Sequence, residues 1–443
     1  MVGTPNAARA DQSSVRVIIA RLAASVPLAA LALALVTVVL FLRAQSLAGP
    51  NNLADAEVLW AFNDFRDSVY YPAVAFIDGV NPYDPQAYRA AYPVKTFPLY
   101  SPLTLVIYAP LSILPIEAAR WVYFWLTVGL YGVLAACLLR FAGRERGLAA
   151  LFWLWALILA SRPGHQNLLN GQTTAQVVLG VLLAVHYAGT RPVLAGLGIL
   201  LASLKPTFGI PVVVLLLCQG HVRTVLASSA AIALGIGAVL AVLGLQHGGV
   251  DSLIDAVRAN LGAHGEHPST NLVTGYARID LAMFASRWSG WIPGTGAELL
   301  LGAGLLLTAG WALRWRNRAG LEHGMSTWSS MLICFAVPLC IYHQSYDALM
   351  LCIPAAALAL GAQRPWAAAL PGLRLFVLLC ALAPLANYLA TDSILRRLAL
   401  EPGIWRYVTV INSSIIVAGF AACLLAMRSA PTSTGGDRQG DGG

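Results

Sequence analysis

The sequence predicts an all-α integral membrane protein, a polytopic helical bundle of about 12 transmembrane helices. Of its 443 residues, 58% are apolar and only 11% are charged, whereas a soluble domain carries about 25% charged residues. Apolar runs of membrane-spanning length recur from near the N-terminus almost to the end of the chain. The cations are nearly all arginine and cluster between these runs, so they report membrane orientation rather than nucleic-acid binding.

The spans alternate in direction across the membrane. By apolar length they are expected at about 22–42, 120–139, 149–161, 173–188, 193–204, 207–219, 224–245, 297–313, 326–342, 347–361, 368–389 and 406–427. Arg16 and Arg21 precede the first span, and a link that contains arginine follows every second span. The positive-inside rule therefore places both ends of the chain in the cytoplasm. The apolar run 102–114 is bounded by prolines and too short to cross, which keeps the arginines of 140–146 inside.

This topology divides the chain into three parts. They are a cytoplasmic N-terminus (1–21), a transmembrane bundle (22–428) and a cytoplasmic tail (429–443) whose composition predicts disorder. The first outer loop, about 43–119, is large and contains juxtamembrane helices. No cleavable signal peptide is evident. The seven cysteines lie in apolar runs without metal-ligand spacing, so we interpret them as packing residues and expect no metal.

Polar groups collect on the predicted outer side. They are Asp64, Asp67, Lys95, the segment 162–174, Lys205, His264, His267, Arg278, Asp280, the segment 343–347, Arg396 and Arg397. Ionisable residues at membrane depth are costly and are functional candidates by default. A transporter needs polar groups that are reachable from both sides, so a one-sided cluster favours an enzyme that works at the outer interface.

The segment 62–76 reads as an amphipathic helix along the membrane surface, kinked near Pro72. Its apolar stripe comprises Phe62, Phe65, Val69, Pro72 and Phe76. Asp64 and Asp67 share the opposite face. Two carboxylates three residues apart repel, so one should hold its proton more tightly than usual and can serve as a general base for a hydroxyl group. The alternative is a solvated acidic face.

Two segments near expected span ends are open to a structural and a functional interpretation. "GHQNLLNGQTT" (164–174) is either a loop with a helix cap at its threonines or a re-entrant segment in which His165, Asn170 and Gln172 bind sugar hydroxyls. "HQSYD" places His343 and Asp347 one helical turn apart. They form either a hydrogen-bonded pair that orients the imidazole or, through the aspartate, a cap for the next span.

Two single residues also stand out. Lys205 lies between two short apolar spans, and the only other lysine is Lys95. Its side chain either snorkels to the interface or contacts a phosphate, and the near-absence of lysine elsewhere favours the phosphate. Tyr100, in "FPLYSPL" (97–103), is an interfacial aromatic at the entry to the juxtamembrane helix.

In this order and spacing, "DFRD…VYY…GVNPYDP", "FPLYSPL", "NGQTT", "KPT" and "HQSYD" resemble glycosyltransferase family 87 over most of residues 55–350. This group of the GT-C superfamily includes actinobacterial polyprenyl-phosphate-mannose-dependent mannosyltransferases and related arabinofuranosyltransferases. The resemblance implies a GT-C-type bundle that uses a lipid-phosphate sugar on the outer side of a bacterial plasma membrane. It implies inversion at the anomeric carbon and no cofactor besides the lipid-linked donor.

The resemblance also implies roles for residues. In many relatives the first outer loop reads D-x-x-V-Y and its aspartate is the general base. Here "DFRDSVYY" has two extra residues, so either Asp64 matches, as the start "DFR" favours, or Asp67 takes the part. Lys205, with Arg396 and Arg397 as further candidates, would bind the donor phosphate. The sugar and the acceptor would contact His165, Asn170, Gln172, His343, Asp347 and Tyr100.

The substrate and the class of protein leave alternatives. We expect the transferred sugar to be mannose, as in the commonest relatives, with arabinofuranose as a nearly equal alternative. The acceptor is a glycolipid, a glycan or a protein. The sequence shows no soluble Rossmann-like domain and no DxD motif, which argues against a nucleotide-sugar donor. From other classes, a flippase for a lipid-linked sugar and a non-catalytic subunit of an envelope-assembly complex remain alternatives.

Overall fold

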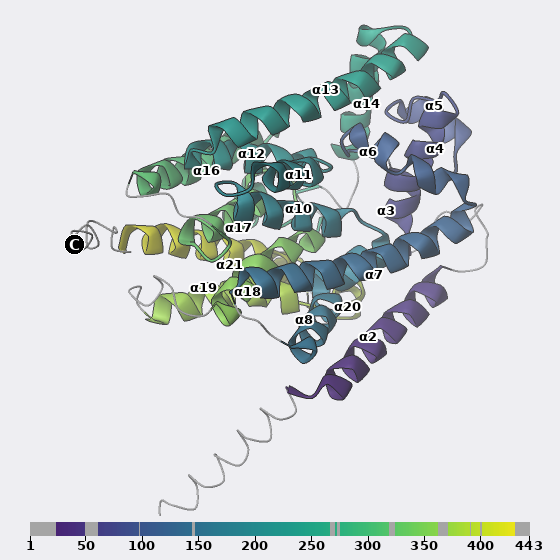
Figure 1. Cartoon of the computed structure of the whole chain (residues 1–443). Helices are drawn as coiled ribbons and strands as arrows, with labels where there is room; N and C mark the ends of the chain where they lie inside the picture. Colours follow the sequence, from purple (N-terminus) through teal and green to yellow (C-terminus); the bar gives the residue numbers. More distant parts are fainter. Residues whose placement is uncertain are drawn as a thin grey trace, which may run out of the picture.

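The computed structural model describes residues 24–48, 61–96, 98–143, 147–265, 271–272, 275–318, 324–361, 371–389, 391–398 and 401–429. These residues form helices and connecting loops, with no strand among them beyond an isolated bridge between Arg278 and Gln344. The predicted all-α fold is therefore confirmed (Figure 1). The expected cytoplasmic N-terminus (1–21) and nearly all of the expected tail (429–443) lie outside the described residues.

Five helices in the described part are long and apolar enough to cross a membrane. They are α2 (Val26–Leu47), α7 (Ile116–Phe141), α13 (Val222–Gln246), α16 (Thr295–Asn317) and α21 (Pro402–Ser429). Shorter apolar helices occupy the other expected spans: α8 (Leu148–Ala160), α10 (Thr174–Tyr187), α11 (Pro192–Ala202), α12 (Pro206–Gln219), α17 (Trp328–Cys340), η3 (Ser345–Leu351) continued by α18 (Cys352–Leu360), and α19 (Pro371–Ala386). The membrane bundle is thus supported, while the total of 12 spans stays a prediction.

The remaining helices are short connections. They are α3 (Asn63–Phe65), η1 (Arg66–Tyr70), α4 (Tyr71–Ile77), α5 (Pro85–Ala91), α6 (Leu103–Ile107), η2 (Ala109–Ile113), α9 (Arg162–Asn170), α14 (Val250–Gly265), α15 (Leu281–Ser289) and α20 (Asp392–Leu398). Figure 1 shows α3–α6 and α14 at one end of the bundle, where α2 ends and α7 begins. We call this the loop end; the arginine pattern predicts that it faces outward.

The helix expected at 62–76 is not one continuous α-helix. It is divided into α3, the π-helical turn η1 and α4, and the Tyr71 amide donates to the carbonyl of Arg66, five residues earlier. Pro72 has no amide hydrogen, and in an α-helix its ring would clash with the carbonyl of Ser68, which favours a wider turn at this place. The expectation that Asp64 and Asp67 share the polar face of one continuous helix is therefore wrong. The alternative of a solvated acidic face is wrong too, because Asp67 is fully buried.

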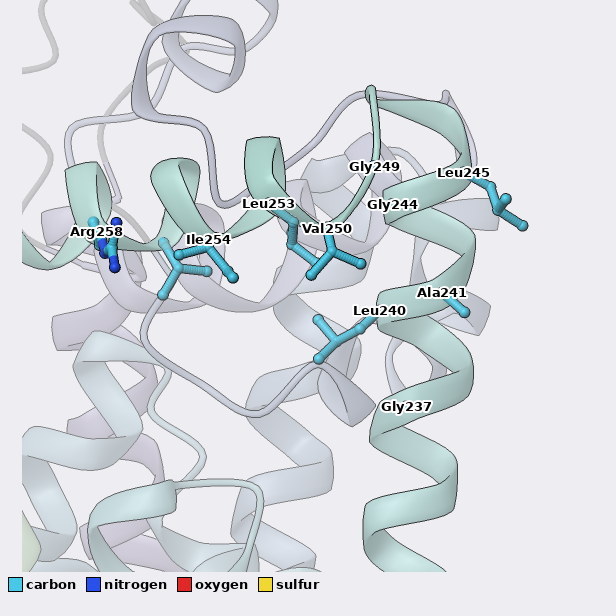
Figure 2. A pocket seen from close by; sticks show the side chains of 11 residues that line it. Gly237, Leu240, Ala241, Gly244, Leu245, Gly249, Val250, Leu253, Ile254 and Arg258 are labelled. Atoms are coloured by element: carbon cyan, nitrogen blue, oxygen red, sulfur yellow. The ribbon is translucent and has the colours of Figure 1, made fainter.

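An apolar groove of about 680 Å³ lies between α13 and α14 (Figure 2). Leu240, Leu253 and Val257 line it, and Arg258 at one end is its charged lining residue. The same leucines pack with Tyr83 and Leu105, which joins the groove wall to the first outer loop. The groove lining contains no carboxylate and no histidine, so acid–base chemistry must be sought elsewhere.

Candidate active site

The carboxylate of Asp64 is held where the first outer loop contacts the end of α9. The amide of Phe62, whose φ is 60°, donates to the carbonyl of Leu169 over 2.7 Å and anchors α3 there. Gly171 caps α9 with a φ of 70°, and a Cβ at this residue would lie 2.4 Å from Cβ of Phe65. Only glycine fits both requirements, so "NGQTT" is a close docking point for α3.

Gln172 connects the Asp64 carboxylate to Tyr100. Its side-chain amide donates to Oδ2 of Asp64, and its Oε1 accepts from the Tyr100 hydroxyl. The Tyr123 hydroxyl donates to the main-chain carbonyl of Gln172 over 3.1 Å. These three bonds fix the amide and thereby orient the carboxylate, while the Asp64 side chain stays partly exposed.

The surroundings of Asp64 make it a weaker acid than usual. Its pKa is raised to about 6, mainly by burial and to a smaller extent by repulsion from Asp67, while hydrogen bonds from Gln172 and Asn170 and the charge of Lys205 act in the opposite direction. The expectation that one of the two acids holds its proton more tightly is met at Asp64, although burial outweighs the repulsion from Asp67. A carboxylate with such a pKa is mostly ionised at neutral pH and accepts a proton readily.

Asp67 occupies a different environment, with no exposed surface. Its Oδ1 lies 2.6 Å from Nε of Arg66, which is also buried. Its Oδ2 accepts from the amides of Lys95 (3.1 Å) and Thr96 (3.0 Å) and from the Thr96 hydroxyl (3.2 Å). Asp67 thus ties two parts of the first outer loop together, and this geometry favours Asp64 over Asp67 as the base.

We expect Asp67→Asn to lower stability rather than chemistry. The amide keeps the shape but leaves the Arg66 guanidinium buried without a counter-charge, and breaking a buried pair costs about 3 kcal/mol or more. Thermal unfolding in detergent should show a clear fall in midpoint, compared with Asp251→Asn on exposed α14 as control. An unchanged midpoint would contradict the structural role.

A second polar group gathers around Lys205, immediately before α12. Its ammonium lies 2.8 Å from Oγ1 of Thr174 and 2.9 Å from Oδ1 of Asp347, and 4.6 Å from the ring centre of Tyr346. The Thr174 hydroxyl also donates to Asp347 over 3.1 Å. A lysine ammonium has three donors, of which two are used here, so one stays available to a ligand.

The Asp64 and Lys205 groups meet at Tyr100. Its hydroxyl contacts Gln172, and its ring centre lies 5.6 Å from the Lys205 ammonium. The amide of Ser101 donates to the carbonyl of Leu204 over 2.9 Å. The segment 99–101 therefore lies between the Asp64 carboxylate, which it contacts through Gln172, and the Lys205 ammonium.

Of the two interpretations of "HQSYD", the structure supports the one in which Asp347 caps the next helix. Its Oδ2 accepts from the amide of Gln344 over 3.1 Å, within a capping box at the start of η3. His343 is fully buried, and its Nδ1 lies 2.9 Å from the carbonyl of Ile341. Within the described residues its Nε2 has no partner, and the bonds of Asp347 go to Lys205, Thr174 and Gln344 instead.

The other candidates lie apart from this cluster. The His165 ring stacks on Tyr388 with centroids 6.0 Å apart. Arg397 is exposed on α20, and the side chain of Arg396 lies outside the described residues. In the described part of the chain, no three His, Cys, Asp or Glu side chains gather in a way that could hold a metal ion.

Sequence reasoning missed three members of the cluster. Tyr123 lies within an apolar run, where aromatics usually pack, and Tyr346 lies in the polar segment 343–347, beside the histidine and aspartate that were singled out. No local pattern marks these tyrosines as partners of Gln172 and Lys205. The sequence suggested Thr174 as a helix cap. In the structure its hydroxyl contacts both Lys205 and Asp347. The contact between Thr174 and Asp347 joins residues 173 positions apart, which no local pattern reveals.

A family model described as glycosyltransferase family 87 matches residues 98–340, more than half of the chain. The match runs from α6 to α17 and includes Tyr100, Gln172 and Lys205, while Asp64 precedes it and Asp347 follows it. No curated protein and no solved structure matched the chain.

Proposed function

Because the chain belongs to glycosyltransferase family 87, we propose that it transfers a sugar from a polyprenyl-phosphate donor to an acceptor hydroxyl outside a bacterial plasma membrane. The family and the long apolar helices make it a membrane glycosyltransferase. One observation carries the finer proposal: a partly exposed carboxylate with a raised pKa is held beside a buried lysine at the loop end.

The reaction needs a base for the acceptor. As the acceptor oxygen attacks the anomeric carbon, Asp64 takes up the hydroxyl proton, and the bond from that carbon to the phosphate oxygen breaks. Attack from the face opposite the leaving group inverts the anomeric centre, and one carboxylate suffices for this displacement. The leaving group departs as a phosphate anion, so no general acid is required.

Lys205 would stabilise the departing phosphate. The Lys205 side chain is buried, and Asp347, Thr174 and the Tyr346 ring fix its position. Its third N–H can donate to a phosphate oxygen, and a charge-assisted bond of this kind strengthens as negative charge develops. Asp347 would act by holding the ammonium in place.

Neutral polar groups around the carboxylate would bind the sugar. Gln172, Asn170 and Tyr100 supply amides and a hydroxyl next to Asp64, and the buried Nε2 of His343 adds a further polar atom. We favour mannose as the sugar, with arabinofuranose as the alternative, and a glycolipid, glycan or protein as acceptor.

The test is direct transfer by the purified protein in nanodiscs. It is incubated with labelled polyprenyl-phosphate-mannose and a membrane extract as acceptor, and labelled product is separated from donor. A product that forms only with active protein supports the proposal, and its anomeric configuration tests inversion. Polyprenyl-phosphate-arabinofuranose serves as the second donor. Absence of transfer from both would overturn the proposal of a polyprenyl-phosphate donor.

We expect transfer to depend on pH through Asp64. The base works only when deprotonated, and its pKa is raised to about 6, so kcat/KM should fall as the pH drops below about 6. The Gln172 hydrogen bond lowers this pKa, so Gln172→Leu should move the inflection to higher pH. A profile that stays flat to about pH 4.5 would contradict Asp64 as the base.

A further inference from the structure

Two arginines and a histidine are carried by α2 and α9, which contact each other. Arg43 is on the last turns of α2 and is exposed, and Arg162 is the first residue of α9 and half-buried. His165 follows one turn later with 7% of its surface exposed. Its ring stacks on Tyr388, whose hydroxyl donates to the carbonyl of Ala160 over 2.6 Å.

The two arginines lack the carboxylate partner that three buried cations of the same chain have. Arg66, Lys205 and Arg278 each form an ion pair with an aspartate. Among the described residues, neither Arg43 nor Arg162 contacts a carboxylate, and Nε2 of His165 has no hydrogen-bond partner. An unpaired charge that is partly withdrawn from water is costly, so a bound anion would stabilise this group.

The two arginines also act electrostatically on His165. Burial first, and then the charges of Arg43 and Arg162, lower the pKa of His165 to about 4. Burial and the charge of Arg43 likewise lower the pKa of Arg162. His165 is therefore subject to the positive charge of both arginines, and a bound anion would reverse this effect.

We propose that Arg43, Arg162 and His165 form a binding site for the phosphate group of a phosphoglycerolipid. Guanidinium groups bind phosphate oxygens with two parallel hydrogen bonds, and the positive N-terminal end of α9 adds to the attraction. The site adjoins the loop-end terminus of α2, a helix of membrane-spanning length. The end of such a helix lies at the depth of the lipid headgroups. Tyr388, with 37% of its surface exposed, supplies an interfacial aromatic.

This phosphate differs from the one that leaves during sugar transfer. Arg162 and Asn170 are the two ends of α9, about 12 Å apart at the rise of an α-helix. Asn170 is hydrogen-bonded to Asp64. A leaving phosphate must lie next to the anomeric carbon and hence near Asp64, so the Arg162 end would hold a second phosphate. The distinction between the two phosphates rests on the proposed reaction at Asp64, whereas binding of a phosphoglycerolipid at the Arg162 end does not require turnover.

Lipid binding by the purified full chain in detergent tests this directly. Native mass spectrometry or fluorescence titration would compare three probes: dioleoyl-phosphatidylglycerol, dioleoylglycerol, which lacks the phosphate, and undecaprenyl phosphate. Arg162→Gln should weaken phosphatidylglycerol binding about tenfold, and adding Arg43→Gln should weaken it further. Dioleoylglycerol should bind equally to all variants, and Arg162→Lys should recover part of the affinity for phosphatidylglycerol.

Arg258→Gln is the matched control, since this exposed arginine on α14 carries the same charge. If it lowers phosphatidylglycerol binding as much as Arg162→Gln does, the effect is general surface charge and the site is refuted. Equal binding by the double variant and the wild type refutes it too. A loss confined to undecaprenyl phosphate would overturn the phosphoglycerolipid assignment. None of these readouts needs turnover, so they are independent of the transfer assay.

Discussion

Replacing Asp64 by asparagine should abolish sugar transfer and leave the protein folded. The amide is nearly isosteric but cannot take the acceptor proton, and loss of a general base typically costs about 10²- to 10⁴-fold in rate. Stability should not fall, because burial and the nearby Asp67 make the charged carboxylate costly in the folded protein. Transfer rate and thermal midpoint, measured on the same preparation, separate the two effects.

Asp78→Asn is the control for this experiment. Asp78 lies in the same outer loop, is exposed and accepts a hydrogen bond from the Tyr92 hydroxyl, so its replacement should change transfer little. Asp67→Asn is the critical comparison. If Asp64→Asn retained transfer while Asp67→Asn lost it at an unchanged thermal midpoint, the base would be Asp67, and the proposed site would be wrong.

The helices were predictable because their signal is local. Each described helix of membrane-spanning length coincides with an apolar run in the sequence, and a lipid environment demands such runs. The run 102–114 was expected to form a juxtamembrane helix too short to cross, and the structure has the two short helices α6 and η2 there. The family was recognisable because several short motifs recur in a fixed order, although each motif alone is unspecific.

The geometry around Asp64 was not predictable, because it depends on contacts between distant residues. The bond from Gln172 to Asp64 joins residues 108 positions apart, and that from Lys205 to Asp347 joins residues 142 apart. The π-helical turn was missed because helical periodicity assumes 3.6 residues per turn. That assumption placed both aspartates on one face. In the structure, Asp67 lies in the π-helical turn and forms a buried ion pair, whereas Asp64 precedes the turn and stays partly exposed.

Neutralising Lys205 should have two separable consequences, one for stability and one for transfer. Lys205→Met leaves the buried Asp347 carboxylate without its cation, and Asp347→Asn leaves the ammonium without its anion. Removing one member of a buried pair costs about 3–5 kcal/mol, so each single variant should show a large drop in thermal midpoint. Both should also transfer sugar slowly, the first because the phosphate contact is gone and the second because the lysine is no longer fixed.

The double variant Lys205→Met/Asp347→Asn distinguishes the two roles. It contains no unpaired charge, and the asparagine can still accept from the Gln344 amide that caps η3, so its midpoint should recover most of the loss. Transfer should not recover, because the spare ammonium N–H that we assign to the leaving phosphate is still missing. Recovery of both stability and transfer would mean that Lys205 only holds "HQSYD" against "NGQTT", and the cation for the phosphate would then have to come from another residue.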